Sequence, residues 1–455
     1  MIDQEEFDHC LDQVENAGVI PKPPHYDVAR LKAIVIGALL LTTITVRAAF
    51  AARSTDELVQ EFETQIDAWD IASASATLKD LDASGPPEVQ ASLRSLRSIL
   101  AFYSGDYGQA RSLLDEVRDP EQIKDGGVSL AEVIRKTEEA FRGSPQTRFG
   151  HFEARYKPGE DVIVVGDLLA ELEDAYRFFE NLLGFSPEGP VRVEVFSDYD
   201  AFRYATTLPE KDLEVSGAVG VCKFNKLMVV KRRLLLRGYR YLNTAVHEYV
   251  HFLVYHLTRN NAPVWLHEGI ASYLEDLYDR ERGSKDPGAI GADAYRSRLQ
   301  PSSETLLATA VQNNTIIPFS RMHPSLVKLN TREEVALAFA QVQVAVEFLM
   351  VRTEGKGLGR LLKALGEGKD LSTALQAVVG LDLHSFELAV KESLLQRGLK
   401  AIPGMEPPGL TIKKDGSAGA DEDLEWREVE HKQAREFTRL GDLLKSRSQF
   451  PAAVI

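Results

Sequence analysis

The pattern of hydrophobic and polar positions divides this chain into a helical first part, a mixed middle and a helical last part. From residue 54 to about residue 142, hydrophobic residues recur at helical spacing, as they do at Leu58, Phe62 and Ile66. That spacing places them on one face of a helix, so this range is predicted to be helical. The turn at Gly85-Pro86-Pro87 separates two of the predicted helices.

The middle of the chain alternates hydrophobic and polar residues in short runs, which is the pattern of strands. It predicts a small mixed sheet, together with an amphipathic helix at Leu168–Leu183 that ends at Gly184. A long helix is predicted from about Tyr239 to Leu257. The predicted strands are Arg148–Tyr156, Val191–Phe196, Ser216–Val221 and Lys226–Val230.

The last third of the chain begins with a segment after Asp279 that is rich in glycine and charge, and this composition predicts a surface loop. Helical patterns return from Glu304 and are clear in Glu333–Val351 and Leu358–Leu365. Residues 401–423 hold proline, glycine and aspartate in a mixture typical of a linker.

Two segments resemble parts of a tetratricopeptide repeat, a helical hairpin of about 34 residues. The segment Leu100–Ala110 resembles the turn between the two helices, and a plain helical bundle is the alternative. The segment Arg439–Ala453 resembles the first half of such a repeat and stops before a second helix could finish. We therefore expect the chain either to be truncated there or to cap a repeat unusually. The resemblance implies a protein partner bound through helical repeats.

Residues 33–46 form an apolar run of 14 residues that is preceded by Arg30 and Lys32. A spanning helix usually needs about 20 apolar residues, so the run better fits the core of a signal peptide. Ala49-Phe50-Ala51 resembles a cleavage site for such a peptide. A buried soluble helix is the alternative, but the run has no polar face.

The acidic residues 1–32 do not fit a signal peptide, unless translation begins near Val28. If Met1 is the true start, an uncleaved membrane anchor with a short cytoplasmic tail is expected instead. Both interpretations place residues 54–455 outside the cytoplasm, either held at a membrane or released after cleavage.

Composition narrows the chemistry that the chain can perform. The net charge of −15 argues against a nucleic-acid partner, because affinity for phosphates comes mostly from Lys and Arg. The two cysteines, Cys10 and Cys222, cannot build a disulfide framework or a thiolate zinc cluster. Any metal ion must therefore be held by histidines and carboxylates.

Positions 247–251 read His-Glu-Tyr-Val-His within the predicted long helix. His247 and His251 are four residues apart and share one helix face, so both imidazoles can reach one metal ion. Glu248 is rotated by about 100° from His247 and can act on a water molecule beside the ion without ligating it. Chance produces this motif in roughly 2% of chains of this size, and the histidines are then ordinary core or surface residues.

The segment Pro263–Glu275, PVWLHEGIASYLE, makes a family resemblance specific. Gluzincin peptidases follow His-Glu-x-x-His with a second helix that carries Trp-Leu-x-Glu-Gly-x-Ala, and its Glu is the third zinc ligand. Here that residue is Glu268, with 16 residues between it and His251. From about Gln146 to Glu275 the chain resembles the peptidase MA-like group of that clan, which is bacterial, often exported and often fused to tetratricopeptide repeats.

The resemblance implies one zinc ion per chain, held by His247, His251 and Glu268, with Glu248 as the catalytic base. Two histidines and one carboxylate leave a fourth tetrahedral position open, which is typical of a catalytic zinc site. His267 is a rival third ligand, but it points about 100° away from Glu268 around the helix, so Glu268 is favoured. The candidates to accept a hydrogen bond from a ligand imidazole are Ser272, Glu275 and Asp276, each of which is equally explained as plain surface.

One residue departs from the family pattern. Gluzincins place a Tyr or His where it stabilises the oxyanion, whereas this chain has Phe339 in the matching segment Ala338–Gln341. Either another group donates this hydrogen bond or turnover is reduced. Two alternatives to a peptidase follow: a degenerate protein that binds zinc and peptides without cutting, and a helical-repeat scaffold with a structural zinc. The intact Glu248 counts against both.

The fold class expected is α+β, with a gluzincin-like, two-lobed metallopeptidase domain preceded by an α-helical repeat-like region. The predicted activity is zinc-dependent hydrolysis of peptide bonds in a peptide or protein substrate. Gly269 is expected to let the second site helix pack close to its neighbour. The predicted divisions are 1–32 (tail), 33–53 (membrane anchor or signal), 54–145 (helical), 146–280 (upper lobe and active-site helices), 281–400 (helical lower lobe), 401–423 (linker) and 424–455 (partial repeat).

Overall fold

The computed structural model of the protein describes residues 54–84, 90–117, 124–125, 128–157, 161–208, 218–231, 240–282, 295–329 and 331–402. The predicted membrane-directed segment 33–53 and the partial repeat 424–455 lie outside these residues, as does nearly all of the predicted linker. The chain divides into two units, Met1–Glu57 and Leu58–Ile455, and the architecture below is that of the second.

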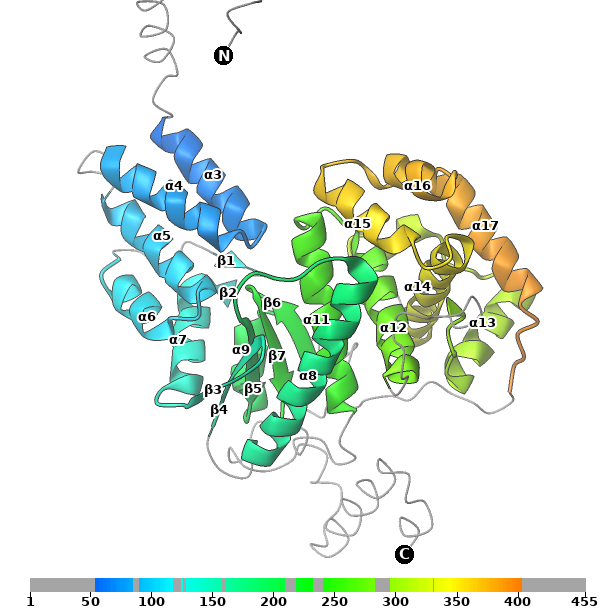
Figure 1. Ribbon diagram of the computed structural model, residues 1–455, viewed down its shortest axis with the longest axis horizontal. Helices are drawn as coiled ribbons and strands as arrows, with labels where there is room; N and C mark the ends of the chain where they lie inside the picture. Colours follow the sequence, from blue (N-terminus) through cyan, green and yellow to red (C-terminus); the bar gives the residue numbers. More distant parts are fainter. Residues whose placement is uncertain are drawn as a thin grey trace, which may run out of the picture. The chain divides into compact units, whose positions relative to one another are not determined.

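In the described residues before the main sheet, the chain forms helices and one short hairpin, as Figure 1 shows. Between α5 and α6 the chain turns at Gly105, whose φ is +80°, and the Asp106 side chain caps α6. This turn lies where the tetratricopeptide resemblance predicted one, and the assignment of the hairpin to such a repeat stays a prediction. The elements are α3 (Thr55–Asp67), α4 (Ile71–Ser84), α5 (Gln90–Tyr103), α6 (Tyr107–Asp115), β1 (Lys124–Asp125), β2 (Val128–Ser129) and α7 (Leu130–Phe141).

The main sheet has five strands in the order β3-β4-β5-β7-β6. The three inner strands β4, β5 and β7 run parallel, and the edge strands β3 and β6 run antiparallel to their neighbours. The sheet is therefore mixed, as predicted. Its strands are β3 (Gln146–Phe149), β4 (Phe152–Tyr156), β5 (Val191–Phe196), β6 (Gly220–Lys223) and β7 (Lys226–Val230).

Two hairpins form the edges of this sheet. The prediction of one continuous strand over Arg148–Tyr156 is wrong, because the chain reverses at Gly150, whose φ of +55° suits glycine. At the other edge, β6 and β7 are joined by Phe224 and Asn225, with φ of +54° and +57°. Two left-handed residues in succession match the twist of a two-residue hairpin.

Helices cover both faces of the sheet (Figure 1). One face packs against α8 (Asp161–Leu183) and α11 (Tyr241–Thr258), through Val191, Val193 and Val195 of β5. The opposite face packs against α7 and α9 (Tyr199–Thr206), through Phe196 of β5. Because successive side chains of a strand point to opposite faces, a single strand can contribute to both cores.

A cluster of charged and polar side chains is buried between α6 and the sheet. Tyr107 of α6 donates a hydrogen bond to Glu194 of β5, and Lys226 of β7 donates to the Tyr107 hydroxyl at 2.9 Å. Lys226 Nζ also lies 2.9 Å from Glu194 Oε2, with both side chains about 2% exposed or less. Burial disfavours the charged form and lowers the pKa of Lys226, against the opposing attraction of Glu194. Buried charges of this kind persist only when they are paired.

The last part of the described chain is helical, and with the small sheet it gives a mixed fold compatible with the α+β class. Gly269 of α12 is tightly packed against α14, since a Cβ there would lie 2.6 Å from the Val342 carbonyl oxygen. The prediction of close packing at Gly269 is confirmed. The elements are α12 (Val264–Glu281), α13 (Pro301–Asn313), η5 (Phe319–Met322), η6 (Leu326–Lys328), α14 (Arg332–Arg352), α15 (Gly357–Gly366), α16 (Leu371–Val379) and α17 (Leu383–Gln396).

Within the described residues, one stretch, Glu333–Arg352 of α14, is long and apolar enough to cross a membrane by length and composition. Its most apolar window is 67% buried inside the protein, and α14 packs against α12 and α13. Burial on this scale is typical of a helix in a protein core, and such core helices also meet the criteria of length and composition for a membrane span.

Candidate metal centre

The helix α11 presents its two histidines on one side and packs on the other. Val246, Val250 and Val254 form an apolar stripe that is buried in the core. His247 and His251, four residues apart, lie together at the edge of this stripe with ring centroids 4.8 Å apart. The helical period thus brings both imidazoles to one place without help from the rest of the chain.

The three predicted ligands converge. The Nε2 atoms of His247 and His251 lie 3.2 Å apart, and Glu268 Oε2 lies 3.7 Å and 3.6 Å from them. Two ligands held at zinc distances of about 2.05 Å in a tetrahedron are about 3.3 Å apart. Among the described residues this is the one group of His, Cys, Asp and Glu side chains whose ligand atoms gather closely enough to hold a metal ion.

His247 is oriented by a second carboxylate. Its Nδ1 lies 3.2 Å from Glu275 Oε2, which leaves Nε2 directed at His251 and Glu268. A metal-binding histidine usually donates its other ring N–H to such an acceptor, which fixes its tautomer. Of the three acceptors that the sequence offered, Glu275 makes this contact, while Asp276 instead accepts from the backbone N–H of Arg298 at 3.0 Å.

His247, His251 and Glu268 are called the ligand group below. Glu248 lies outside this group, and only 7% of the residue is exposed. Burial raises the pKa of its carboxyl group, partly offset by the nearby His251 and His247 and by a hydrogen bond from the Cys222 backbone N–H. Cys222 lies on β6, so the edge strand of the sheet holds this carboxylate. A buried carboxylate with a raised pKa is a better proton acceptor than one in water.

Burial and the neighbouring charged groups act in opposite directions on the pKa values of Glu268 and His247. Burial disfavours ionisation of Glu268, but His251 and hydrogen bonds from both histidines outweigh it and hold the pKa of Glu268 well below its usual range. Burial likewise disfavours a charged His247, yet its bonds to Glu268 and Glu275 raise its pKa well above the usual value. A carboxylate that stays ionised beside two imidazoles is suited to a cation.

These contacts and the donor set fit a zinc ion. Zinc prefers imidazole nitrogen and carboxylate oxygen, and three protein ligands leave one position for a water molecule or substrate. Two N–H groups cannot face each other at 3.2 Å, so at least one of the opposed Nε2 atoms presents its lone pair. His247, His251 and Glu268 would hold the ion.

His267, the rival third ligand, is not in the ligand group. Its ring centroid lies 5.8 Å from that of His251 and 6.4 Å from that of Tyr255. Burial lowers the pKa of His267 to about 3. The rotation of His267 away from Glu268 around α12 therefore separates their roles, as the sequence predicted.

A cavity of about 550 Å³ contains these groups. The edge strand β6 forms one wall through Gly220, Val221 and Cys222, and α11 and α12 supply the histidines and carboxylates. Phe339 of α14 also lines the cavity, so the residue that departs from the family pattern does lie at the site.

Two further histidines, His256 and His151, have partners in the structure that are distant in the sequence. His256 bonds Asn225 Oδ1 at 3.0 Å, and burial lowers the pKa of His256 to about 4. His151 stacks on Tyr176 and contacts Glu173 at 3.1 Å. These partners are 31 and 22 residues away in the chain, so no local pattern could have identified them. The sequence had named Glu275 among three candidate acceptors, but it did not single out Cys222, whose backbone N–H bonds Glu248.

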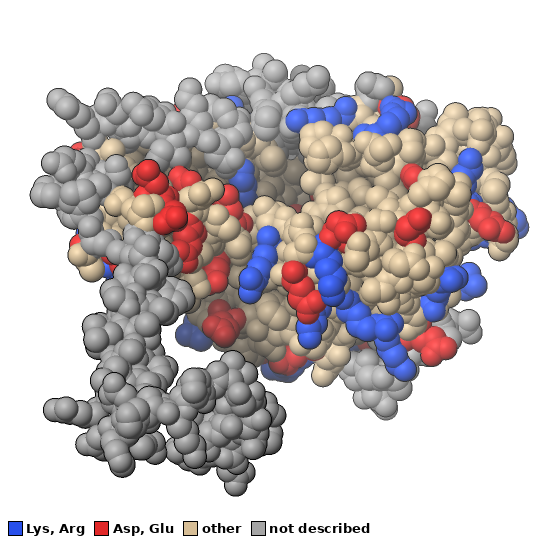
Figure 2. All heavy atoms as spheres, turned by 90° about the horizontal axis from the view of Figure 1, so that it is seen from above, with Lys and Arg blue, Asp and Glu red and all other residues tan. Residues whose placement is uncertain are grey.

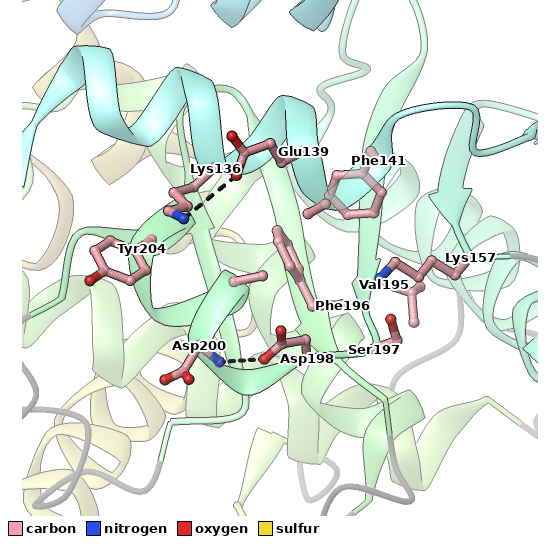
Figure 3. Close-up of a pocket in the computed structure, with 12 residues that line it drawn as sticks. Lys136, Glu139, Phe141, Lys157, Val195, Phe196, Ser197, Asp198, Asp200 and Tyr204 are labelled. Atoms are coloured by element: carbon pink, nitrogen blue, oxygen red, sulfur yellow. Dashed lines mark hydrogen bonds and ion pairs between the residues drawn. The ribbon is translucent and has the colours of Figure 1, made fainter. Parts of the chain in front are cut away.

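A second hollow, of about 340 Å³, lies where β4 and β5 end, and Figure 3 shows its lining. Lys136 lies 3.5 Å from Glu139, and Asp198 accepts a hydrogen bond from the Asp200 N–H at 2.8 Å (Figure 3). Lys136, Glu139 and Asp198 thus have partners within the lining of this hollow.

In the view of Figure 2, Lys and Arg side chains are interspersed with Asp and Glu over the described part of that face. The exclusion of a nucleic-acid partner, drawn from the net charge of −15, stays a prediction.

No family model and no curated protein matches the chain. Among solved structures it is similar to an M1 zinc metallopeptidase from Deinococcus radiodurans, with 15% identity, a TM-score of 0.31, and coverage of 58% of this chain and 53% of that one. A mutant from that organism and a two-domain M1 zinc metallopeptidase mutant bound to L-arginine align over the same shares at 14% identity and a TM-score of 0.31. The chain spans about half the length of these structures. The likeness is distant, so the function proposed below rests on the residues of the site.

Proposed function

We propose that this chain is a zinc-dependent metallopeptidase of the gluzincin type. The observation that carries the proposal is the convergence of His247, His251 and Glu268 beside a buried Glu248 in one open cavity. A purely structural zinc site has no use for a carboxylate beside an open coordination position. The two lobes of such an enzyme correspond here to the sheet with β6 on one side of the cavity and the helices α12 and α14 on the other.

When bound, zinc supplies Lewis-acid polarisation of a carbonyl and lowers the pKa of water. Glu248 takes a proton from the attacking water as the new C–O bond forms at the scissile carbonyl carbon. It then delivers that proton to the leaving nitrogen as the C–N bond breaks, so the products are a carboxylic acid, which keeps the second proton of the water, and an amine. The hydrogen bond from Cys222 keeps Glu248 aimed at the cavity through both transfers.

The substrate is proposed to be an extended peptide or protein segment. The strand β6 lies at the edge of the sheet and lines the cavity, so its free side faces the space beside Glu248. A peptide that pairs with β6 as an added strand would have its backbone held across the ligand group. The predicted strand began at Ser216, and its first residues, 216 and 217, lie outside the described residues.

Two other functions compete with this proposal. A degenerate protein that binds zinc and peptides without cutting is favoured by Phe339, which lines the cavity but has no hydroxyl group to donate. A helical-repeat scaffold with a structural zinc would not account for the buried Glu248 and its hydrogen bond from Cys222.

The decisive experiment combines metal analysis with peptide cleavage in wild type, Glu248→Gln and Glu392→Gln. Glu392 is exposed on α17 and serves as the matched control. A mixture of internally quenched peptides serves as the substrate. The proposal expects zinc in all three proteins and cleavage in wild type and Glu392→Gln alone, because an amide in place of the Glu248 carboxylate keeps the shape but cannot accept the proton. Equal cleavage by the Glu248→Gln variant would show that Glu248 is not the base. Bound zinc without cleavage in wild type would favour the degenerate alternative.

A further inference from the structure

Peptide hydrolysis places negative charge on the scissile carbonyl oxygen, and the cavity must stabilise it. A hydrogen-bond donor aimed at that oxygen is worth about 100-fold to 1,000-fold in rate. Phe339 lines the wall made by α14 and offers no polar hydrogen. A side-chain donor for this oxygen, where hydrolysis uses one, therefore belongs to another residue of the cavity.

Within the described part of the chain, no protein group uses the hydrogen-bond donor of His267. It lines the cavity one residue before Glu268, and its ring contacts are with His251 and Tyr255. Among the described residues, neither ring nitrogen of His267 has a hydrogen-bond partner. Imidazole carries at least one N–H in either tautomer, so a donor is present whichever nitrogen holds the hydrogen.

The other polar groups around the ligand group are already engaged or lie on a different side. The Tyr255 hydroxyl donates to the Asp67 carbonyl oxygen, and the Cys222 N–H is taken by Glu248. Thr244 lies one turn before Glu248 and packs at Gly220, on the side of the base. Asn260 and Ser325 also line the cavity. Among the described residues, the side chain of neither makes a hydrogen bond to His247, His251 or Glu268.

His267 and Glu248 approach the ligand group from different walls. Glu248 is held by the hydrogen bond from Cys222 of β6. The ring of His267 lies instead beside that of His251, with the two ring centroids 5.8 Å apart. That is the division of labour that hydrolysis requires, with a base for the attacking water and a donor for the carbonyl oxygen.

We infer that His267 is a catalytic residue that donates a hydrogen bond to the scissile carbonyl oxygen as that oxygen becomes negatively charged, in place of the phenol that Phe339 lacks. This inference rests on the proposed peptidase function. It makes His267 important for the transition state and of little importance for binding the uncharged substrate.

The experiment compares wild type with His267→Ala, His267→Gln, the double variant His267→Ala with Phe339→Tyr, and His384→Ala. His384 is exposed on α17 and serves as the control. The measurements are zinc content, kcat and KM on the peptide that wild type cleaves fastest, and the Kd of N-phosphoryl-leucinamide. The phosphoryl group of this probe carries tetrahedral anionic oxygens like those of the transition state.

The inference expects His267→Ala to keep its zinc and its KM while kcat falls roughly 100-fold. The probe should bind more weakly by a similar factor, because it reports the same oxygen. The His267→Gln variant, whose amide can donate, should recover part of kcat, and the phenol of Phe339→Tyr should restore activity to the His267→Ala protein. His384→Ala should match wild type.

Two results would overturn the inference and leave the proposed function standing. One is a His267→Ala protein whose kcat stays within about threefold of wild type. The other is loss of zinc from that variant, which would make His267 a ligand or its support. A wild type that holds zinc but neither cleaves any peptide nor binds the probe would remove the proposed function and this inference together.

Discussion

Gly220 of β6 lies so close to Glu248 of α11 that a methyl group on Gly220 would be 2.9 Å from Glu248 Cγ. The same methyl group would lie 2.6 Å from Thr244 Cγ2. Hydrogen is therefore the only side chain that lets the edge strand approach the helix and supply the Cys222 N–H to the carboxylate. The position of the proposed base depends on a residue that has no chemistry of its own.

Gly220→Ala is expected to displace Glu248 and lower kcat/KM by 10-fold to 100-fold, because a shift of about 1 Å in a catalytic group can cost that much. Zinc content should stay near one per chain, since the ligands lie on α11 and α12. The control is Gly166→Ala, whose added Cβ would meet nothing within 4 Å. That helical substitution should stabilise slightly and leave kcat/KM unchanged. An active Gly220→Ala protein would show that Glu248 tolerates the displacement.

Zinc content should be about one per chain in wild type and should fall on replacement of His247, His251 or Glu268 by Ala. Glu275→Ala should still bind zinc, but 10-fold to 100-fold more weakly, because it removes only the group that orients His247. Competition with a chelator of known affinity would measure the difference. Full zinc occupancy in the Glu268→Ala protein would show that the third ligand has been assigned wrongly.

Phe339→Tyr in the otherwise wild-type chain is expected to raise kcat, because it adds a phenol to the wall of the cavity. The effect can approach 100-fold if the cavity otherwise has no donor, and it is smaller where His267 already donates. Steady-state kinetics with one peptide would measure it. Phe348→Tyr, on the same helix but outside the cavity lining, is the control and should not change kcat.

Glu173 should make stability depend on acid pH. Burial disfavours its charge, but hydrogen bonds from the backbone N–H and ring of His151 outweigh this and lower the pKa of Glu173 below its ordinary 4.5. A group with a lowered pKa in the folded state contributes stability above the unfolded pKa and loses it as pH falls through the folded pKa. Glu173→Gln should therefore cost about 1–3 kcal/mol at pH 7, and this difference should shrink as the pH falls below 4.5.

Thermal unfolding at pH 7 and at pH 3 to 4 would measure this effect, with Asp174→Asn as the control. Asp174 is the next residue of α8, and its side chain is 71% exposed. It should change stability little at either pH. A difference between wild type and Glu173→Gln that stays constant with pH would mean that Glu173 acts through its shape and not its charge.

The location of the protein stays a prediction, because residues 33–53 lie outside the described part of the chain. We expect residues 54–455 outside the cytoplasm of a bacterial cell, either anchored by residues 33–53 or released after cleavage. Fractionation followed by N-terminal sequencing would decide between the two. A protein wholly in the cytosol with residues 1–53 intact would contradict both, and a mature start near Ala52 would favour cleavage.

The approach of the two candidate histidine ligands could be predicted from sequence because their spacing along the helix is local. Four residues on any helix bring His247 and His251 to one face, whatever surrounds them. Glu268 required a family resemblance, since nothing in the spacing alone states how α12 crosses α11. The same resemblance placed Phe339 at the cavity, where the structure has it.

Features that depend on distant contacts were missed. The turn at Gly150 was predicted as strand because Phe149 and Phe152 continue the alternation on either side of it. The start of α8 was predicted at Leu168, but the helix begins at Asp161. The prediction missed this first part because residues 162–165 are all apolar, and such a run fits a buried helix as well as a strand. Alternation along β5 would direct Glu194 to water, whereas Tyr107, 87 residues away, covers it.

The Tyr107–Glu194–Lys226 cluster limits how the chain can be cut into fragments. A catalytic fragment that starts near residue 146 would lose Tyr107 and with it the Phe102 ring, 4.6 Å from Lys226 Nζ. Lys226 and Glu194 would then open to solvent, together with the sheet face that α7 covers. Such a fragment should aggregate or expand, and the chain should yield a minimal folded unit only when the segment from α5 onward is retained. The sheet and its helical neighbours are thus expected to fold together, and an exchange of one without the other would require the charges at this boundary to be redesigned.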